Sequence, residues 1–549
     1  MLLLLKLGNL CMTHDHTSNL HDDAWKYCSY LSFKMDCARE QEEVRWSFLR
    51  DKAQGHFNEL AVAQEIKTVE LAKAMPKKAL TRVVSMPKVM MTKAVTKVVH
   101  KPSVMFKVDG LISSQGVKWL DLCKSYKVDK GVSSITVQVS PEKLSANAHK
   151  WYHLLKSENM PKDTVGPITV VTGYEDGNPN GHAQVKQWLY ALGWVPCTFK
   201  FTRDDSGEQK TIEQIRYMKG HDREGELCDS VTRLAKEDPA VSVLEGLTVI
   251  THRLGFFRSM LENCVVDDDG SAWLRAEVGG LTNTLRFKHK KPLANLPAVG
   301  KAWGQEIRDC LVVPNEAEEV LCGFDMVSLE STTKKHYMYP HDPDYVNEMS
   351  TEGFDEHLDL AKHAGYLTQV DIDQYALGNR PEVKEVRSKF KPANYACVYG
   401  VKETTLSRQT GMKKAECVLL INAYWERNWA VKKVAKGIYT KATKDGKIWL
   451  KNPVSGFWYS LRYEKDIWST TNQGTGVYCF DKMMSHARNA GVKFNGQFHD
   501  EGAYNIRKGT EAANDALLKG CVDKLNDQLK LNVPLAIDAQ YGPTYGSVH

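Results

Sequence analysis

The chain has 549 residues, of which 42% are hydrophobic and 26% are charged, and its formal net charge is +6. The length predicts two to four domains or subdomains and excludes a single small module, and the composition is that of a globular protein and indicates neither a disordered nor a fibrous class. The 13 cysteines include no CxxC pair, which argues against a zinc site or a secreted disulfide framework. The opening MLLLLKLGNL has an apolar run far shorter than a membrane span, so we expect an N-terminal extension and no membrane partner; the alternative is a signal peptide.

The first half of the chain predicts helices followed by a basic segment. Residues 38–80 carry apolar positions at helical spacing, with a break expected near Gly55. Between Lys73 and Lys107 the chain has nine Lys or Arg residues and no Asp or Glu. Two interpretations of this segment stay open, a solvated surface loop and a contact with a phosphate backbone. We recognise no internal repeat in the chain.

Two carboxylates in the second half stand at the ends of predicted strands, within an α+β pattern that begins near residue 246. Residues 320–330 are typical of a buried strand that ends at Asp325. Residues 494–506 are typical of two strands joined by a turn that contains Asp500. An Asp at a strand end is more often a turn or capping residue than a metal ligand, so the two positions count only in combination.

Carboxylates at two strand ends can meet on one sheet and hold two divalent ions. Hard ions such as Mg²⁺ take oxygen ligands, and two ions about 4 Å apart can clamp the attacking and leaving oxygens of a phosphoryl transfer. We therefore expect Asp325 and Asp500 to bind two Mg²⁺ ions, for which Mn²⁺ can substitute. The backbone carbonyl of Met326 is a further candidate ligand.

A helix between the two carboxylates has a face suited to a nucleotide. Four residues follow one another at steps of four: Arg387, Lys391, Tyr395 and Tyr399. Such a spacing places them on one side of an α-helix, where the positive charge suits a triphosphate and the rings suit a sugar and a base. The alternative is an ordinary amphipathic helix with a basic face and buried rings. Pro392 argues against an uninterrupted helix unless it falls in the first turn, in which case Arg387 lies at the helix entrance, a position still compatible with phosphate binding.

Together these residues resemble three motifs of family A DNA polymerases, the group of bacterial DNA polymerase I and its phage relatives. Residues 325–330 are similar to the family's DxSxxE motif in a loose form, with the same step between Asp and Glu. Residues 387–400 match its RxxxKxxxF/YxxxYG motif at every spacing, and residues 499–501 match its HDE motif. The three motifs stand in the family's order, which makes the resemblance specific.

Weaker similarities extend the resemblance. Residues 355–361 are similar to the family's DxHxxxA segment, which implies that His357 contacts the incoming phosphates. The Thr-Leu-Arg sequence that ends at Arg286 is similar to the family's TGR, with Leu in place of Gly, and implies a contact with the primer terminus. Gln473 begins a segment similar to QGTA, which implies that it reads the minor groove of the nascent base pair.

The resemblance implies a role for each matched residue. Asp325, Asp500 and Glu501 would form the catalytic group, in which Glu501 supports the two metal-binding aspartates. The incoming dNTP would be bound by five residues: Arg387, Lys391, Tyr395, Glu330 and His357. DNA would be contacted by five others: Tyr399, Gly400, Arg286, Gln473 and His499. Glu330 would also exclude a ribonucleotide by filling the space that its 2′-hydroxyl needs.

The implied fold is an α+β right hand, with a palm whose antiparallel sheet bears the carboxylates, and with helical fingers and thumb. The resemblance covers residues 246–549 well and residues 38–245 only in general character. The expected division of the chain is an N-terminal extension at 1–37, a thumb region with a basic insertion at 38–245, palm segments at 246–345 and 466–549, and fingers at 346–465.

The implied function is that of a DNA-directed DNA polymerase, which adds dNTPs to a primer 3′ end on template DNA by two-metal-ion phosphoryl transfer. The region before the expected thumb is too short for a nuclease domain, so we expect no 3′→5′ exonuclease in this polypeptide. A separate exonuclease subunit and a processivity factor are candidate partners. The departures from the family motifs favour a role in phage DNA replication, and hence the cytoplasm of a bacterial host.

Three alternatives stay open. A gap-filling or lesion-bypass polymerase would carry the same residues. A single-subunit RNA polymerase shares the metal-binding aspartates and a lysine-bearing helix, but it lacks counterparts of Glu330 and of the Asp500-Glu501 pair. A non-catalytic DNA-binding protein would have no need of the carboxylates and the basic helix face together.

Overall fold

The computed structural model describes residues 18–204, 206–218, 225–444 and 446–548. The chain divides into two compact units. The first unit, which we call the body, consists of Met1–Ala74 and Pro179–His549. The second unit, which we call the arm, is Met75–Asn178.

A four-stranded antiparallel sheet in the C-terminal part of the body bears the predicted carboxylates. Its strand order is β19-β20-β15-β21. The middle of β15, from Val320 to Phe324, is buried, as expected of a strand with neighbours on both sides and cores on both faces. The elements of this region are β15 (Glu319–Met326), α19 (Ile467–Asn489), β19 (Gly496–Phe498), β20 (Glu501–Arg507), α20 (Glu511–Leu529) and β21 (Ile537–Gly542).

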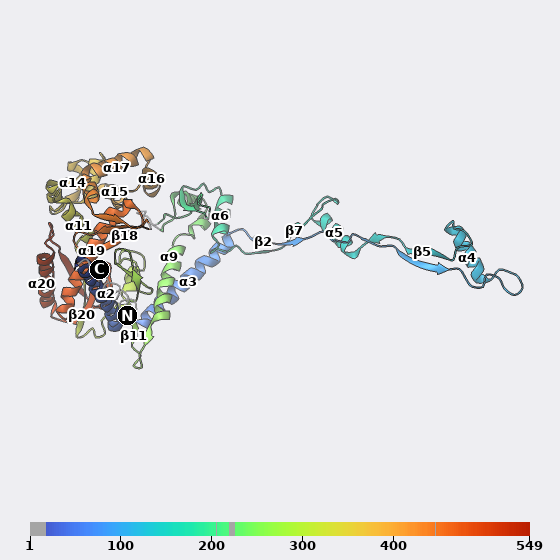
Figure 1. The fold of residues 1–549 in the computed structure, drawn as a ribbon, viewed down its shortest axis with the longest axis horizontal. Coiled ribbons are helices and arrows are strands. Elements are labelled where there is room, and N and C mark those ends of the chain that lie inside the picture. The colour runs from blue at the N-terminus through green and yellow to red at the C-terminus, as the bar shows by residue number, and fades with distance from the viewer. Residues whose placement is uncertain (1–17, 205, 219–224, 445, 549) are drawn as a thin grey trace. The chain divides into compact units, whose positions relative to one another are not determined.

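Alternate residues of β15 face two different cores, because side chains along a strand point to opposite faces. The even-numbered residues from Cys322 to Met326 pack against α19 and α20, which Figure 1 shows with β20 in the orange and red part of the chain. Leu321 belongs to the other core. Asp325 shares the face of Leu321 but lies at the end of the strand, where its side chain is exposed.

The other core joins the N-terminal helices to this sheet. Trp46 and Phe48 of β1 are buried in it, within a small sheet of order β10-β11-β1-β14. Helices α3 and α9 lie side by side (Figure 1) and contribute Leu60 and Phe257. Among the described residues, the stretch Pro239–Asn263 could span a membrane by length and composition alone, but it consists of two helices separated by residues 243–246, and the second, α9, packs in this core. The elements are β1 (Trp46–Phe48), α3 (Arg50–Ala74), α9 (Leu247–Asn263), β10 (Val265–Val266), β11 (Ala272–Leu274) and β14 (Leu311–Val312).

Helix α2 (Ser18–Val44) is attached to α19 by a buried ion pair. The Nζ atom of Lys34 lies 2.7 Å from a carboxylate oxygen of Asp481, and the two side chains are 4% and 1% exposed. Tyr30 donates its hydroxyl proton to the same carboxylate. Because an unpaired charge at this depth is strongly unfavourable, the pair fixes the position of α2 on the body. The predicted end of the N-terminal extension, at residue 37, falls within this helix.

The helices between residues 329 and 437 form two further clusters. In one, α13, α15 and α17 bury residues that include Phe390 and Tyr424. In the other, α11, α12 and α18 bury residues that include Tyr337. A three-stranded sheet, β16-β17-β18, follows them. The elements are α11 (Leu329–Met338), α12 (Pro343–Met349), α13 (Glu356–His363), α14 (Gln369–Ala376), α15 (Val383–Val398), α16 (Glu403–Thr410), α17 (Lys414–Arg427), α18 (Trp429–Gly437), β16 (Thr440–Ala442), β17 (Ile448–Lys451) and β18 (Trp458–Leu461).

Short elements complete the body. They are α6 (His182–Ala191), β8 (Thr198–Arg203), β9 (Gln209–Gln214), α7 (Asp229–Glu237), α8 (Pro239–Ser242), β12 (Val278–Leu281), β13 (Phe287–His289), α10 (Gly304–Arg308) and a 3₁₀ turn at Glu464–Asp466. The main sheet is antiparallel, and long helices are grouped apart from the strands rather than alternating with them in βαβ units. The predicted α+β fold class is therefore confirmed.

The arm is a series of nested antiparallel strand pairs. The chain runs outward through β2, β3 and β4 and returns through β5, β6 and β7, with β2 paired to β7, β3 to β6 and β4 to β5. Helix α5 packs on the first pair around Trp151, and α4 packs on the last pair around Trp119. The elements are β2 (Lys78–Val84), β3 (Met91–Thr92), β4 (Val95–His100), α4 (Ser114–Ser125), β5 (Ser134–Ser140), β6 (Lys143–Leu144), α5 (Ala146–Ser157) and β7 (Ile168–Glu175).

The arm contains an internal repeat, so the expectation of no repeat is wrong. Residues 78–91 align without gaps with residues 93–106, and eight positions are identical. Residues 113–125 align in the same way with residues 145–157, and six positions are identical, including the buried tryptophan of each helix. We call the pair 78–91 and 145–157, with the following β7, the inner module. We call the pair 93–106 and 113–125, with the following β5, the outer module.

The two modules also share their hydrogen bonds. In each module a serine hydroxyl accepts from the backbone N–H three residues on, and thereby caps the helix. The backbone N–H of Gly116 donates to the Ser113 hydroxyl at 2.9 Å, and that of Ala148 donates to the Ser145 hydroxyl at 3.0 Å. The same hydroxyls donate to equivalent carbonyls, Ser113 to Val104 at 2.8 Å and Ser145 to Val89 at 2.7 Å. Equal bonds at equivalent positions indicate a duplicated unit.

The helix break expected near Gly55 does not occur. Helix α3 runs through Gly55, and the interruption lies earlier, at β1, where Arg45 has a φ of +61°. An added side chain at Gly55 would meet nothing within 4 Å, so this glycine serves no close packing. A glycine in an exposed helix interior costs only about 1 kcal/mol, which is too little to end a helix that buries Leu60 and Leu71.

Replacing Lys34 with Met should lower the free energy of unfolding of the body by about 3–5 kcal/mol, because the buried Asp481 carboxylate then lacks its cation. Urea denaturation followed by tryptophan fluorescence measures the change. Arg39→Met is the matched control on the same helix, because Arg39 is 70% exposed and its ion pairs are with exposed acids. Equal, small effects of the two substitutions would contradict the role given to the Lys34 pair.

Candidate active site

The register between β15 and β20 brings the predicted metal-binding carboxylates together. Asp325 lies directly opposite Glu501 in this antiparallel pair. Asp500 occupies the turn before β20, and its carbonyl accepts a hydrogen bond from the backbone N–H of Met326 at 3.1 Å. Phe324 and Met326 are buried, whereas Asp325 is exposed. The backbone positions of Asp325 and Asp500 thus lie close together, at an end of the sheet that solvent reaches.

Strand β21 adds a carboxylate that the sequence analysis missed. Asp538 lies directly opposite Asp325 on the other side of β15. Directly opposed residues of antiparallel strands share a face of the sheet, so Glu501, Asp325 and Asp538 occupy adjacent positions across three strands. The sequence signal for Asp538 was a short alternation from Ile537 to Gly542, which is too weak to assign a register.

The carboxylate of Glu501 is held from the side by the C-terminal segment. The hydroxyl of Tyr545 donates to Glu501 Oε1 at 2.8 Å. The guanidinium of Arg308 lies over the ring of Tyr545, 4.7 Å from its centroid. Burial, and then the charge of Glu501, raise the pKa of Tyr545 well above its ordinary value. The phenol therefore stays protonated and remains a donor.

The donor set at the sheet edge fits a hard divalent ion. It offers the carboxylates of Asp325 and Asp500, with the carbonyl of Met326 at the adjoining strand end. Among the described residues, no group of three or more His, Cys, Asp or Glu side chains is arranged to hold a metal ion. Mg²⁺ binds through one or two carboxylates while water and substrate phosphates supply its remaining ligands, so a two-carboxylate site suits this ion.

The predicted nucleotide face of α15 is open to solvent. Tyr395 and Tyr399 are 53% and 43% exposed, and Lys391 is exposed as well. Phe390, on the other side of the helix, is buried in the α13–α15–α17 cluster. An ordinary amphipathic helix would bury its aromatic rings in that cluster. The exposed rings therefore favour the interpretation of this face as a binding surface.

Helix α15 begins earlier than Pro392 predicted. It starts at Val383, so Pro392 lies in its interior and Arg387 lies in the second turn rather than at the entrance. A proline inside a helix removes one backbone hydrogen bond and costs about 3 kcal/mol. Phe390 and Ala393, next to the proline, are buried in the same cluster, and their packing offsets this cost.

Arg387 is held by a carboxylate of the neighbouring helix. Its Nε lies 2.5 Å from Asp355 Oδ2. Asp355 also caps α13, because its other oxygen accepts from the backbone N–H groups of His357 and Leu358 at 2.8 and 3.0 Å. Burial acts to raise the pKa of Asp355, but the backbone donors and Arg387 outweigh it, and the pKa lies below its ordinary value. An anionic ligand would therefore compete with an ionised Asp355 for Arg387.

His357 lies beside the aromatic end of α15. Its ring makes an edge contact with the ring of Tyr395, with the centroids 5.5 Å apart. The Asn394 amide donates to His357 Nδ1 at 3.1 Å, which leaves the ring proton on Nε2. Burial is the largest cause that lowers the pKa of His357. At neutral pH the ring is thus a neutral donor.

Hydrogen bonds join the C-terminal end of α15 to α19 and to the first turn of α11, the helix that follows the strand carrying Asp325. Gln473 of α19 donates to the hydroxyl of Tyr399 at 2.9 Å, and this hydroxyl donates to Glu330 Oε1 at 2.9 Å. Asn472 also donates to the carbonyl of Glu330 at 2.9 Å. Burial and the charge of Glu330 raise the pKa of Tyr399 to about 12, so its phenol donates at neutral pH. Predicted residues from three helices meet here.

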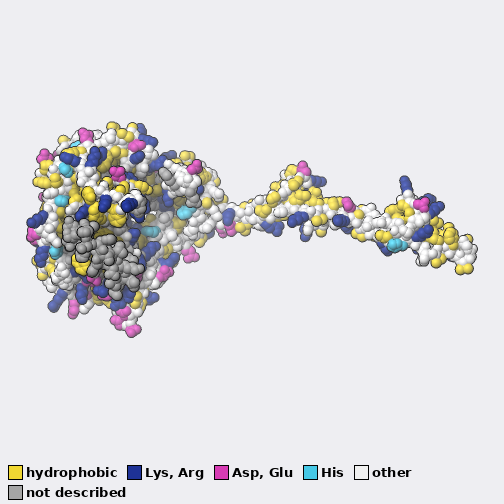
Figure 2. Space-filling view, viewed as in Figure 1, with side chains coloured by type: hydrophobic (Ala, Val, Ile, Leu, Met, Phe, Trp, Pro, Cys, Tyr) yellow, Lys and Arg dark blue, Asp and Glu magenta, His cyan; other side chains and the backbone are white. Residues whose placement is uncertain are grey.

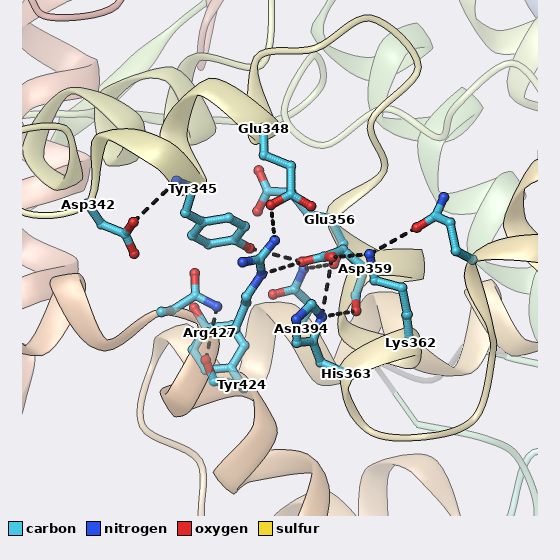
Figure 3. A network of polar contacts seen from close by, with 12 residues as sticks. Asp342, Tyr345, Glu348, Glu356, Asp359, Lys362, His363, Asn394, Tyr424 and Arg427 are labelled. Carbon is cyan, nitrogen blue, oxygen red and sulfur yellow. Dashed lines mark hydrogen bonds and ion pairs between the residues drawn. The ribbon is translucent and has the colours of Figure 1, made fainter.

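Buried polar contacts that the sequence did not reveal fix α13, and Figure 3 shows those around Asp359 and Arg427. Glu356 forms an ion pair with Lys334 of α11 at 3.0 Å. Asp359 accepts from Arg427 of α17 at 3.1 Å, and the Arg427 guanidinium lies over the ring of Tyr345, 3.8 Å from its centroid. Glu356 and Asp359 of α13 thus bind side chains of α11, α12 and α17. These contacts hold the start of α13, with Asp355 and His357, in place.

Arg286 and His499 line the same small recess, together with Lys34. Burial, and then the charge of Arg286, lower the pKa of His499. Leu285, where the family has glycine, is buried and has a left-handed φ of +65°, a conformation that glycine adopts with less strain than leucine. Gly400 has a φ of +68° immediately after α15, a conformation that glycine adopts without strain.

Comparison with known proteins agrees with the motifs. Residues 259–451 match the family model of DNA polymerase family A. DNA polymerase I of Bacillus caldotenax is 23% identical over 288 residues, which cover 48% of this chain and 30% of that protein. DNA polymerase I of Geobacillus stearothermophilus is 23% identical over 287 residues, with the same shares covered. The resemblance to family A DNA polymerases is therefore confirmed.

The chain spans less than a third of the length of these two relatives. A solved structure, described as the POL domain of Pol1 from M. smegmatis in complex with DNA primer-template and dNTP, is similar with a TM-score of 0.47 and 19% identity. This likeness covers 61% of the present chain and 59% of the other.

The stability of the body should fall on acidification because of His289. Burial, and then the positive charges of His499, Lys34 and Arg286, lower the pKa of His289 from 6.5 to about 4. The folded state favours the neutral ring, so the stabilisation is complete above pH 6.5 and is lost as the pH falls towards 4. The loss is on the order of 3 kcal/mol, and urea denaturation at several pH values measures it.

His289→Phe should flatten this pH dependence between pH 6.5 and 4, because the titrating group is removed while an aromatic ring remains next to Phe498. His149→Phe, at an exposed histidine of the arm, is the control and should leave the pH dependence of the body unchanged. An unchanged slope in His289→Phe would assign the acid sensitivity to other groups.

Proposed function

We propose that the chain is a DNA-directed DNA polymerase that extends a primer with dNTPs by two-metal-ion phosphoryl transfer. The observation that carries this proposal is the hydrogen-bond chain through Tyr399 and Glu330. It joins the end of the exposed, basic and aromatic face of α15 to Glu330, on the first turn of the helix that follows the strand bearing Asp325. The match of residues 259–451 to DNA polymerase family A supports the same reaction.

The geometry suggests a role for each residue in the proposed reaction. Two divalent ions, when bound, would polarise the primer 3′-oxygen and the leaving phosphate. Arg387 and Lys391 would bind the triphosphate, with Arg387 exchanging its bond to Asp355 for one to a phosphate oxygen. His357 Nε2 would donate to the same phosphates. Tyr399 would leave Glu330 and Gln473 to make room for the base pair.

The DNA side of the site is part of the same proposal. Arg286 and His499, which line one recess, would contact the primer terminus. Glu330, on the first turn of α11, would lie against the sugar of the nucleotide. Tyr545 would keep Glu501 oriented beside the metal-binding aspartates. We propose further that the enzyme serves phage replication in a bacterial cytoplasm and uses Mg²⁺ or Mn²⁺.

Asp500→Ala should reduce templated primer extension by at least about 10³-fold, because a metal ligand that stabilises transition-state charge is lost. The assay supplies a labelled primer on template DNA with Mg²⁺ and compares dNTPs with no nucleotide. Asp523→Ala, at an exposed acid of α20, is the matched control and should extend normally. Extension by Asp500→Ala at the wild-type rate would refute the site, and an inactive wild-type chain that still binds DNA would refute the proposed reaction.

Glu330→Ala should raise the use of ribonucleotides relative to deoxyribonucleotides by about 10²-fold or more, because the space for a 2′-hydroxyl is opened. The ratio of kcat/KM for rNTP and dNTP incorporation measures it. Glu330→Gln keeps the volume of the side chain and should keep most of the discrimination. Efficient rNTP incorporation by the unmodified chain would instead favour a single-subunit RNA polymerase.

A further inference from the structure

The arm carries more net positive charge than the whole chain. It has 16 Lys or Arg residues and eight Asp or Glu residues, a formal net charge of +8, whereas the chain as a whole has +6. In Figure 2 Lys and Arg side chains follow the arm along its length, with apolar side chains between them. Positive charge concentrated on one unit indicates a polyanionic partner.

Most of these cations have no acid beside them. Within the described part of the chain, ion pairs are made by Lys77 with Asp176 and by Lys78 with Glu175, both where the arm begins and ends. The other 14 cations of the arm make no ion pair with a described residue. Lys and Arg side chains that make no ion pair within the protein are available to bind an anionic ligand.

The duplication has preserved cations on the helix side of each module. Both helices contain two exposed lysines at equivalent positions: Lys118 and Lys124 in α4, and Lys150 and Lys156 in α5. The adjoining strands add Arg82 and Lys97, which lie opposite Val170 and Val137 on the ribbon face that the helix covers. Each module therefore presents three cations in the same arrangement.

The opposite face of each ribbon carries no charge. Side chains alternate along a strand, so the neighbours of these cations point away from the helix. In the inner module they are Thr81, Val83, Thr169 and Val171, and in the outer module they are Thr96, Val98, Thr136 and Gln138. The anionic partner therefore meets the helix side.

The two modules have no exposed aromatic residue at equivalent positions on which unstacked bases could stack. Their repeated aromatic residues, Trp119 and Trp151, are 2% and 3% exposed and form the module cores. Binding of single strands relies on bases stacked on exposed rings, whereas binding of duplex DNA without sequence preference relies on phosphate contacts. Regularly repeated lysines without exposed repeated rings fit the second mode.

We propose that the arm is a duplicated duplex-DNA-binding element, whose two modules contact the phosphate backbone through Lys118, Lys124, Lys150 and Lys156. The proposal rests on the proposed polymerase function, for which duplex DNA is the product, and adds a second DNA contact outside the catalytic site. Each neutralised phosphate releases counterion, so the contact is strongest at low salt and carries no sequence preference.

The test is equilibrium binding of the full chain to a fluorescent DNA duplex of several helical turns, without nucleotide, over a series of KCl concentrations. The variant K118Q/K124Q/K150Q/K156Q should lower the slope of log K against log[KCl] by about 3–4, because each lost phosphate contact removes about 0.9. A duplex of one turn should show a smaller difference between variant and wild type. Circular dichroism checks that the exposed substitutions leave the fold intact.

The matched control is V83S/V98S, which changes the exposed valines at equivalent positions on the uncharged face and should leave the slope unchanged. An unchanged slope in the lysine variant overturns the proposal. Weaker DNA binding by the valine variant alone also overturns it, because the uncharged face would then be the one that meets DNA. Because binding is measured without nucleotide, a chain that binds DNA through the arm but extends no primer would refute the polymerase function and not this inference.

Discussion

The antiparallel register of β15 with β20 is the constraint on which the rest of the site depends. A slip of one residue would turn every side chain of β15 to the opposite face, burying Asp325 among apolar residues and exposing Phe324. Two separate cores exclude that slip, because the even-numbered residues pack against α19 and α20 while Leu321 packs with Trp46. The carboxylates therefore owe their position to apolar packing on both faces of a single strand.

Buried ion pairs fix the positions of the helices around this sheet. The Lys34–Asp481 pair attaches α2 to α19, the helix that also presents Gln473 to Tyr399. On the other side, Lys334 of α11 holds Glu356 of α13, next to the acid that binds Arg387. Each of these pairs fixes a helix that bears a candidate site residue, while the site residues themselves stay accessible.

Sequence could predict the parts of the site that short-range pattern determines. Apolar runs that end at Asp325 and Asp500 mark strand ends, and a step of four from Arg387 to Tyr399 marks one helix face. Other features depend on contacts between distant segments. Asp538 needs the register of β21, Pro392 lies inside a helix because neighbouring residues are buried, and β1 interrupts the helices because it pairs with strands more than 200 residues away. The repeat was missed because its halves are nested, with offsets of 15 residues outward and 32 on the return.

Because the two modules are nested, the arm can have grown by insertion of complete modules. The inner module is closed by the short β3–β6 pair, and the whole outer module lies between those two strands. A copy inserted at that point leaves the hydrogen bonds of the inner module intact, so evolution could lengthen or shorten the arm by complete modules at its far end. The reach of the arm would then vary among related proteins in discrete steps, while the sheet that bears the carboxylates is left undisturbed.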